Sequence, residues 1–138
     1  MTNEAPVLGG VIQDFQAGQF YWSPDGGSRF VTGGIKSKGE GAGAYTGLLG
    51  FPTSNELYGF RAGGVRQTFQ GGAITWSPFA GSHITFGSIN WLWTQLGRES
   101  GPWGYPLADE YPVQGGSSQN FENGVVTWTP QATTVSYS

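Results

Sequence analysis

The sequence predicts a mainly β protein made of tandem pseudo-repeats, each a short β-hairpin followed by a link, with one short helix in a link. Two observations predict this fold: a glycine-rich phrase that occurs three times, and the alternation of apolar and polar residues within it. The copies are spaced by about 52 to 54 residues, a period typical of repeat architectures. We therefore expect a propeller-like or lectin-like arrangement of repeats in one domain, 1–138, with copies at 1–54, 55–108 and, incompletely, 109–138.

The phrase itself predicts a hairpin. It runs from a Gly-Gly pair to a tryptophan followed by Ser-Pro or Thr-Pro, over residues 9–24, 63–78 and 115–130. In the middle copy Val65, Gln67 and Phe69 alternate with other residues, and Gly71-Gly72 supplies the turn. Pro78 ends the second strand because proline cannot donate a hydrogen bond to a sheet.

The link between hairpins occurs twice and differs in its helical character. Residues 88–97 place apolar side chains at helical spacing, so they predict a short amphipathic helix, with Ser88 able to cap its start and Gly97 its end. The equivalent residues 35–48 contain four glycines, each costing about 1 kcal/mol in a helix relative to alanine. We expect a loop there.

Composition narrows the classes of partner. Charged residues are only 11% of the chain, the net charge is −3 and the six basic residues are scattered, so we expect no nucleic-acid partner. Without cysteine there is neither a disulfide nor a thiolate metal site, and we expect no metal and no cofactor. No window is long and apolar enough to insert into a membrane, and residues 1–12 do not resemble a signal peptide.

Both links end in a similar motif, Leu49-Gly50-Phe51-Pro52 in the first and Trp103-Gly104-Tyr105-Pro106 in the second. Together with the Gly-Gly to Trp-Ser-Pro phrase, this order and spacing resembles the LGFP repeat family across essentially the whole chain. The Gly-Ala-His segment of that family is represented by residues 81–83 in the second copy and 27–29 in the first. The third copy departs from it at residues 133–135.

The resemblance implies a function in binding and not in catalysis. LGFP repeats are known mainly from exported actinobacterial proteins, where they accompany mycolyltransferases or peptidoglycan-acting enzymes and are thought to tether them to the cell wall. It therefore implies a non-enzymatic module whose partner is a polysaccharide or cell-wall glycan, located extracellularly or at the cell wall. The absence of cysteine does not fix the compartment, so a cytoplasmic location also stays open.

The repeated aromatic and amide residues are the first candidates for ligand contact. A partly exposed indole can stack on a sugar ring while neighbouring amides bond its hydroxyls. Large apolar residues repeated position for position are also what packing between repeats requires, and we favour that role for the tryptophans and, by a smaller margin, a structural role for the glutamines. These residues are Trp22, Trp76, Trp128, Gln13, Gln67 and Gln119.

Three further candidates lie where the phrase meets the variable link. His83 and Arg29 share one position in successive copies and could donate to a ligand from equivalent sites. A lone histidine without cysteine or an acidic pair makes a poor metal site, so we expect His83 to bond a neighbouring repeat from a loop. Trp91 falls off the apolar stripe of its helix and is expected to be exposed.

Three functions remain open from the residues. The first is non-catalytic, lectin-like glycan binding with weak sites at several repeat junctions. The second is a structural or protein-interaction module that self-associates, possible because the ends of an open repeat array lack partners. The third and least favoured is a glycoside hydrolase using one unrepeated carboxylate, for which Asp25, Glu40 and Glu99 are the candidates. The repeated Glu4, Glu56 and Glu110 are expected to be structural.

Overall fold

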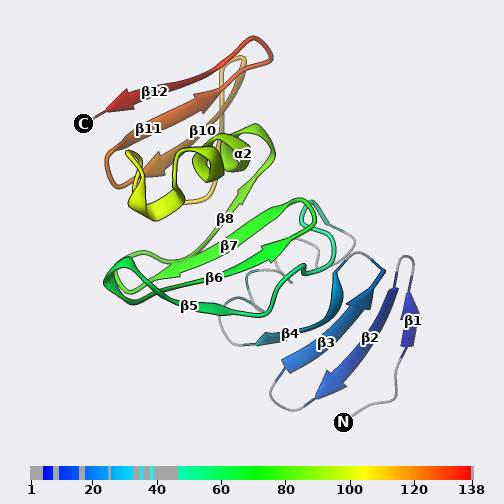
Figure 1. The fold of residues 1–138 in the computed structure, drawn as a ribbon. Helices are drawn as coiled ribbons and strands as arrows, with labels where there is room; N and C mark the ends of the chain where they lie inside the picture. The colour runs from blue at the N-terminus through cyan, green and yellow to red at the C-terminus, as the bar shows by residue number, and fades with distance from the viewer. Residues whose placement is uncertain are drawn as a thin grey trace.

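Three antiparallel sheets follow one another along the chain (Figure 1). The computed structural model describes residues 5–7, 10–15, 18–24, 26–32, 35, 38 and 47–137. The first sheet contains β1 (Ala5–Val7), β2 (Gly10–Phe15), β3 (Gly18–Ser23) and β4 (Gly27–Thr32). The second contains β5 (Leu57–Phe60), β6 (Gly64–Phe69), β7 (Gly72–Ser77) and β8 (Gly81–Phe86). The third contains β9 (Tyr111–Val113), β10 (Gly116–Phe121), β11 (Gly124–Trp128) and β12 (Thr133–Tyr137).

The predicted hairpins are confirmed as β2–β3, β6–β7 and β10–β11, the central pair of each sheet. Every sheet is a four-stranded meander, the form of a propeller blade, and the sheets do not close into a barrel. The outer strands of each sheet were not predicted: β1, β5 and β9 are only three or four residues long, and β4, β8 and β12 include Ser or Thr and lack a clear alternation of apolar and polar residues. The mainly β repeat fold is therefore correct, and each unit is a sheet instead of a hairpin alone.

Facing residues in the hairpin register define one face of each sheet. Gln67 lies opposite Ile74, and Val65 lies opposite Trp76, so all four point to the same side. We call the side that bears the repeated glutamine the glutamine face. In the second sheet, residues of this face belong to an apolar cluster with residues of the first sheet and the first link; in the third, they belong to a cluster with the second link.

The predicted helix is present as α2 (Gly87–Gln95), which lies between the second and third sheets in Figure 1. It buries Ile89 and Trp93, as its apolar spacing predicted. The expected cap at Ser88 is wrong: the helix begins one residue earlier, after Phe86, with no side-chain cap. Gly97 does follow the helix in the left-handed region, at φ 102°.

The first link is only partly described. Ile35 and Lys38 are helical, which the high glycine content did not predict. Ile35 is 3% exposed and packs in the cluster between the first and second sheets. Residues 39–46, which hold three of the four glycines, lie outside the described residues, so the loop predicted there stays a prediction.

The Gly-aromatic-Pro motif of each link docks on the hairpin that follows it. The amide of Phe51 donates to Gln70 Oε1 at 3.0 Å, and the amide of Tyr105 donates to Glu122 Oε1 at 2.8 Å. Backbone bridges pair Pro52 with Phe69 and Pro106 with Phe121. Both links are thus held by the same bonds, although their sequences differ.

The glycine of this motif is required on two counts. Gly104 has φ +75°, where residues with a Cβ are strained, and a Cβ there would lie 2.9 Å from the Cβ of Glu122. Gly50 repeats this situation, with φ +72° and Gln70 as the obstructing side chain. Because the glycine has no side chain, the Gln70 or Glu122 side chain can approach it closely. That side chain then accepts a hydrogen bond from the backbone N–H of the next residue.

We predict that Gly104→Ala destabilises the protein more than Gly81→Ala does. Gly81 has a similar φ, +76°, but no heavy atom within 4 Å of the added methyl, so its substitution isolates the backbone strain of about 1–2 kcal/mol. Gly104→Ala must also displace Glu122 and weaken its bond to Tyr105. Urea unfolding of both variants measures the difference, and equal losses would contradict the packing explanation.

Candidate functional site

The junctions between sheets are fixed by the repeated glutamines. Gln67 Nε2 donates to the carbonyl of Phe30 in β4 at 3.1 Å and to that of Ser54 at 2.8 Å. Gln119 repeats both bonds one unit later, to Ile84 in β8 at 2.9 Å and to Ala108 at 2.8 Å. Each amide therefore joins the last strand of one sheet to the link and hairpin of the next.

The backbone N–H groups of the same two strand residues, Phe30 and Ile84, are bonded by a second side chain from the next repeat. Asn55 Oδ1 accepts the amide N–H of Phe30 at 3.0 Å, and Asp109 Oδ1 accepts that of Ile84 at 3.1 Å. The free edge of the last strand is thus bonded by the following repeat on both its N–H and its C=O. Such an edge is otherwise a site for unwanted strand pairing.

These hydrogen bonds indicate a structural role for the repeated glutamines. Gln67 and Gln119 are 0% exposed, so neither can reach a ligand from solution. Gln13 occupies the same position in the first sheet, is partly buried and borders a cleft. The favoured structural interpretation holds for two of the three glutamines, and Gln13 alone adjoins a surface.

Two of the three repeated tryptophans, by contrast, are exposed instead of buried in the core. Trp22 is 45% and Trp76 36% exposed, so the favoured packing interpretation is wrong for them; Trp128 is partly buried against the second core cluster. The buried tryptophans are Trp93 and Trp103, both 1% exposed and both from the second link. Repetition did not distinguish these groups, because exposure depends on what the link covers.

Trp128 lines a cleft of about 430 Å³ at the junction of the second and third sheets. Its other walls are Phe86 from the end of β8, Gly87, Ser88 and Ile89 from the start of α2, and Glu110 and Ser117 from the third unit. The cleft therefore combines apolar surface with a carboxylate and hydroxyls, and its volume lies within the range of small-ligand sites, about 300–1,000 Å³.

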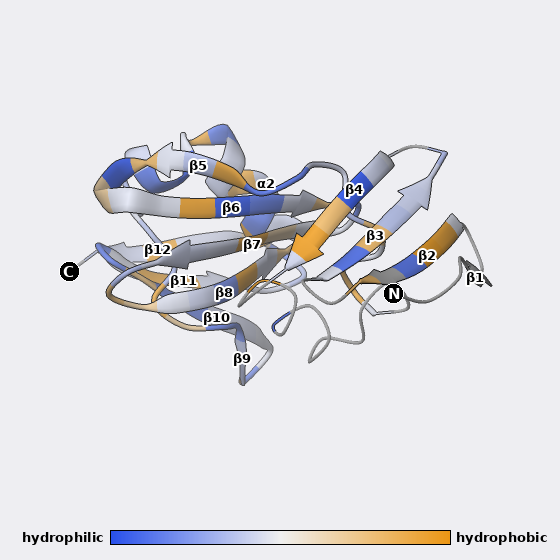
Figure 2. Cartoon of the chain, turned by 90° about the horizontal axis from the view of Figure 1, so that it is seen from below, coloured by the Kyte–Doolittle hydropathy of each residue, from blue (hydrophilic) through white to orange (hydrophobic). Residues whose placement is uncertain are grey.

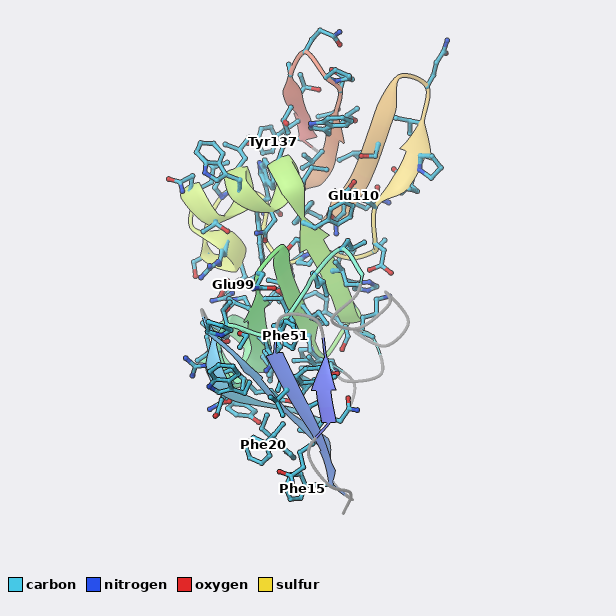
Figure 3. The ribbon with its side chains drawn as sticks, turned by 90° about the vertical axis from the view of Figure 1, so that its right-hand side faces the viewer. Phe15, Phe20, Phe51, Glu99, Glu110 and Tyr137 are labelled. Carbon is cyan, nitrogen blue, oxygen red and sulfur yellow. The ribbon has the colours of Figure 1, made fainter. Side chains whose placement is uncertain are left out.

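Glu110 gives this cleft its polarity; Figure 3 labels it beside the strands of the third sheet. Its Oε2 accepts a hydrogen bond from Ser117 Oγ at 2.7 Å. Burial raises the pKa of Glu110, and the bond from Ser117 partly offsets that rise. The equivalent Glu56 instead accepts the hydroxyl of Tyr58 at 2.5 Å, so the two junctions present different polar groups.

Trp22 lines a second, smaller cleft of about 280 Å³ on the glutamine face of the first sheet. Unlike the cleft at Trp128, its described lining residues all come from a single sheet. Its remaining lining residues are Val11, Gln13, Phe15, Phe20, Tyr21 and Ser28.

His83 and Arg29 hold equivalent places, as predicted, but both lie in strands, so the loop expected for His83 is wrong. Arg29 Nε donates to the carbonyl of Gly26 at 2.7 Å, and His83 Nε2 lies 2.6 Å from the carbonyl oxygen of Ala80. His83 Nδ1 is 3.3 Å from Asp109, which confirms its expected contact with the neighbouring repeat.

Asp109 is the centre of a polar cluster at this junction that the sequence did not indicate. It forms an ion pair with Lys38 of the first link and faces His83. Burial alone would raise the pKa of Asp109, but the bonds from Lys38 and the Ile84 amide, the Lys38 charge and His83 together hold it below its ordinary value.

The remaining candidate residues differ in their exposure to solvent. Trp91 is 63% exposed on α2, as expected, and does not line the cleft at Trp128. Glu99 is 5% exposed and pairs with Arg66 at 2.9 Å in the interior, so it cannot meet a substrate. Asp25 and Glu40 lie outside the described residues. Among the residues described, no three of His, Cys, Asp and Glu are grouped to hold a metal, and no helix could cross a membrane.

Comparison with known proteins gives one result. A family model described as LGFP repeat matches residues 1–47, 49–101 and 104–137. No match was found among curated proteins. The boundaries of the matches fall close to the Gly-aromatic-Pro motifs at which the structure joins one unit to the next.

We predict that Gln119→Leu costs about 1–3 kcal/mol of stability, because two buried carbonyls lose their donor. Gln95→Leu, at an exposed position near the end of α2, should change stability by about 0.5 kcal/mol or less. Chemical denaturation measures both. A Gln119→Leu protein as stable as the wild type would contradict the structural role.

We also predict that Asp109→Asn lowers stability at neutral pH but not in acid. The lowered pKa stabilises the folded chain fully above about pH 3.9, the value for unfolded aspartate, and this is lost as pH falls through the folded pKa. Asn retains the acceptor for Ile84, as Asn55 does for Phe30. Unfolding at several pH values should show the wild type and variant converging in acid; a constant difference would refute this.

Proposed function

The chain belongs to the LGFP repeat family, and from that premise we propose that it binds carbohydrate without catalysis, at the cleft beside Trp128 and at the exposed Trp76. The observation that supports this most directly is the cleft at Trp128, where an indole, a carboxylate and hydroxyls meet at a repeat junction. A pyranose has an apolar C–H face and a rim of hydroxyls, so it needs both kinds of surface.

The arrangement suits a hydroxyl-rich and uncharged or weakly charged ligand. Glu110 accepts from Ser117 with one oxygen, and its other oxygen can accept from a sugar hydroxyl. Its negative charge disfavours uronic acids and other anionic sugars. The partner we propose is a polysaccharide such as a cell-wall glycan, and the location is accordingly extracellular or at the cell wall.

Affinity is proposed to come from several weak sites on one polymer. Trp76 occupies in the second sheet the register position that Trp128 occupies in the third, opposite Val65 as Trp128 is opposite Ser117. It is also exposed, so a second contact is available along the array. Sites linked in one rigid chain raise the effective concentration of each sugar unit at the next.

Catalysis is not part of the proposal. The LGFP repeat is a repeat-module family and not a known catalytic family. Hydrolysis of a glycoside needs two carboxyl groups flanking the scissile bond. In the cleft at Trp128, Glu110 is the one carboxylate among the described lining residues.

We predict that Trp128→Ala weakens glycan binding by about tenfold or more, the loss of about 1.4 kcal/mol of stacking. Trp91→Ala is the matched control, since it removes an exposed indole outside the cleft. Calorimetric titration with neutral oligosaccharides and purified wall polysaccharide measures both. If no neutral glycan binds the wild type, the proposed function is wrong.

Ser117→Val tests the cleft with less risk to the fold. Valine already occupies this register position in the second sheet, as Val65. The substitution removes the hydroxyl that orients Glu110, so we expect weaker glycan binding, by about five- to tenfold, with little loss of stability. A variant that binds as tightly as the wild type would exclude the Glu110–Ser117 pair from the site.

A further inference from the structure

The glutamine face of the first sheet differs from those of the other two in its exposure, and none of the residues that the structure describes covers it. Position for position, Phe20 corresponds to Ile74 and Val126. Ile74 and Val126 are both 0% exposed, whereas Phe20 is 42% exposed. In the second and third sheets this face packs against a link, whereas no described link residue packs on the face around Trp22.

The side chains on this face of the first sheet also differ in type from their equivalents in the second sheet. Two positions that are aliphatic in the second sheet, Ile74 and Ile84, are aromatic in the first, as Phe20 and Phe30. The ring of Phe20 packs edge-on against that of Phe15, with ring centroids 5.4 Å apart. Its centroid is 4.8 Å from the ring centroid of Phe30. A link packed as it is on the second sheet would meet larger rings here, and such overpacking is unfavourable. The face therefore suits a different occupant.

The uncharged and aromatic side chains of the face favour contact with the same face of a second copy of the chain. Its described members carry no charge, so two copies can meet without like-charge repulsion although the chain has a net charge of −3. Aromatic side chains are enriched at the centres of protein interfaces. Those members include Val11, Gln13, Phe15, Phe20, Trp22, Ser28 and Phe30.

We propose that this face is a self-association surface, on which two copies of the chain pack face to face about a two-fold axis. Figure 3 shows Phe15 and Phe20 at the end of the molecule remote from the third sheet. Figure 2 shows hydrophobic residues along β2 and β4 of the same sheet. An isologous contact there closes on itself and yields a dimer, with both Trp128 clefts left open. The proposal does not depend on glycan binding.

Sedimentation equilibrium of the whole chain over a wide concentration range tests it. The mass of the wild type should rise from 14.7 kDa to twice that value and no further. Phe20→Glu should weaken association by about 100-fold, because a charge would be buried among apolar rings. Tyr58→Glu, at a 69% exposed aromatic on the second sheet, should leave it unchanged.

Several results would overturn the proposal. These are a wild type that stays monomeric, a mass that grows beyond the dimer, and equal effects of Phe20→Glu and Tyr58→Glu. A monomeric wild type whose glycan binding is lost in Phe20→Glu would instead assign the face to a sugar.

A crosslinking experiment keeps the test valid if Phe20→Glu does not fold. The chain has no cysteine, so Ser28→Cys places a single thiol at an exposed position of the face. We expect it to form a covalent dimer on oxidation much faster than Ser136→Cys at the opposite end of the array. Equal rates for the two variants would contradict a face-to-face dimer.

Discussion

The structure depends on a set of hydrogen bonds that is formed twice, at the last strand of the first sheet and at the last strand of the second. The last strand offers an N–H and a C=O, at Phe30 in the first sheet and Ile84 in the second, and side chains of the next repeat bond both. Unpaired edges are costly when buried and promote aggregation when exposed. By meeting both groups with an amide and an Asx side chain, each repeat fixes the position of the sheet before it.

The same bonds hold two junctions with different contents. The side chains packed between the first and second sheets are apolar and include Leu49 and Phe51. Figure 3 shows Phe51 between these sheets. Between the second and third sheets a buried ion pair joins Arg66 to Glu99, and the Arg66 guanidinium lies 3.9 Å from the ring centroid of Phe60. A buried ion pair of this kind contributes little net stability but is costly to break. Hydrogen bonds therefore define the geometry, and the links are free to diverge in composition.

This division explains why repetition does not mark the residues at which we propose that a ligand binds. The repeated glutamines and glycines are occupied in joining units, whereas the repeated tryptophans lie where a link leaves the sheet partly uncovered. What surrounds each tryptophan differs: Glu110 and Ser117 at Trp128, and a bare aromatic face at Trp22. One repeated residue thus lines a cleft at a repeat junction in one unit and lies on a largely aromatic sheet face in another.

The sequence alone determined the repeat, its three hairpins, the helix α2 and the family, because these follow from local spacing: period-2 alternation, glycine turns, and apolar residues at helical intervals. It also indicated that Gln67 and Gln119 have a structural role. Tertiary structure decided the rest. The exposure of Trp22 and Trp76, the burial of Glu99 and the cluster around Asp109 depend on which link covers which sheet. Those contacts join residues far apart in the chain, and no local pattern encodes them.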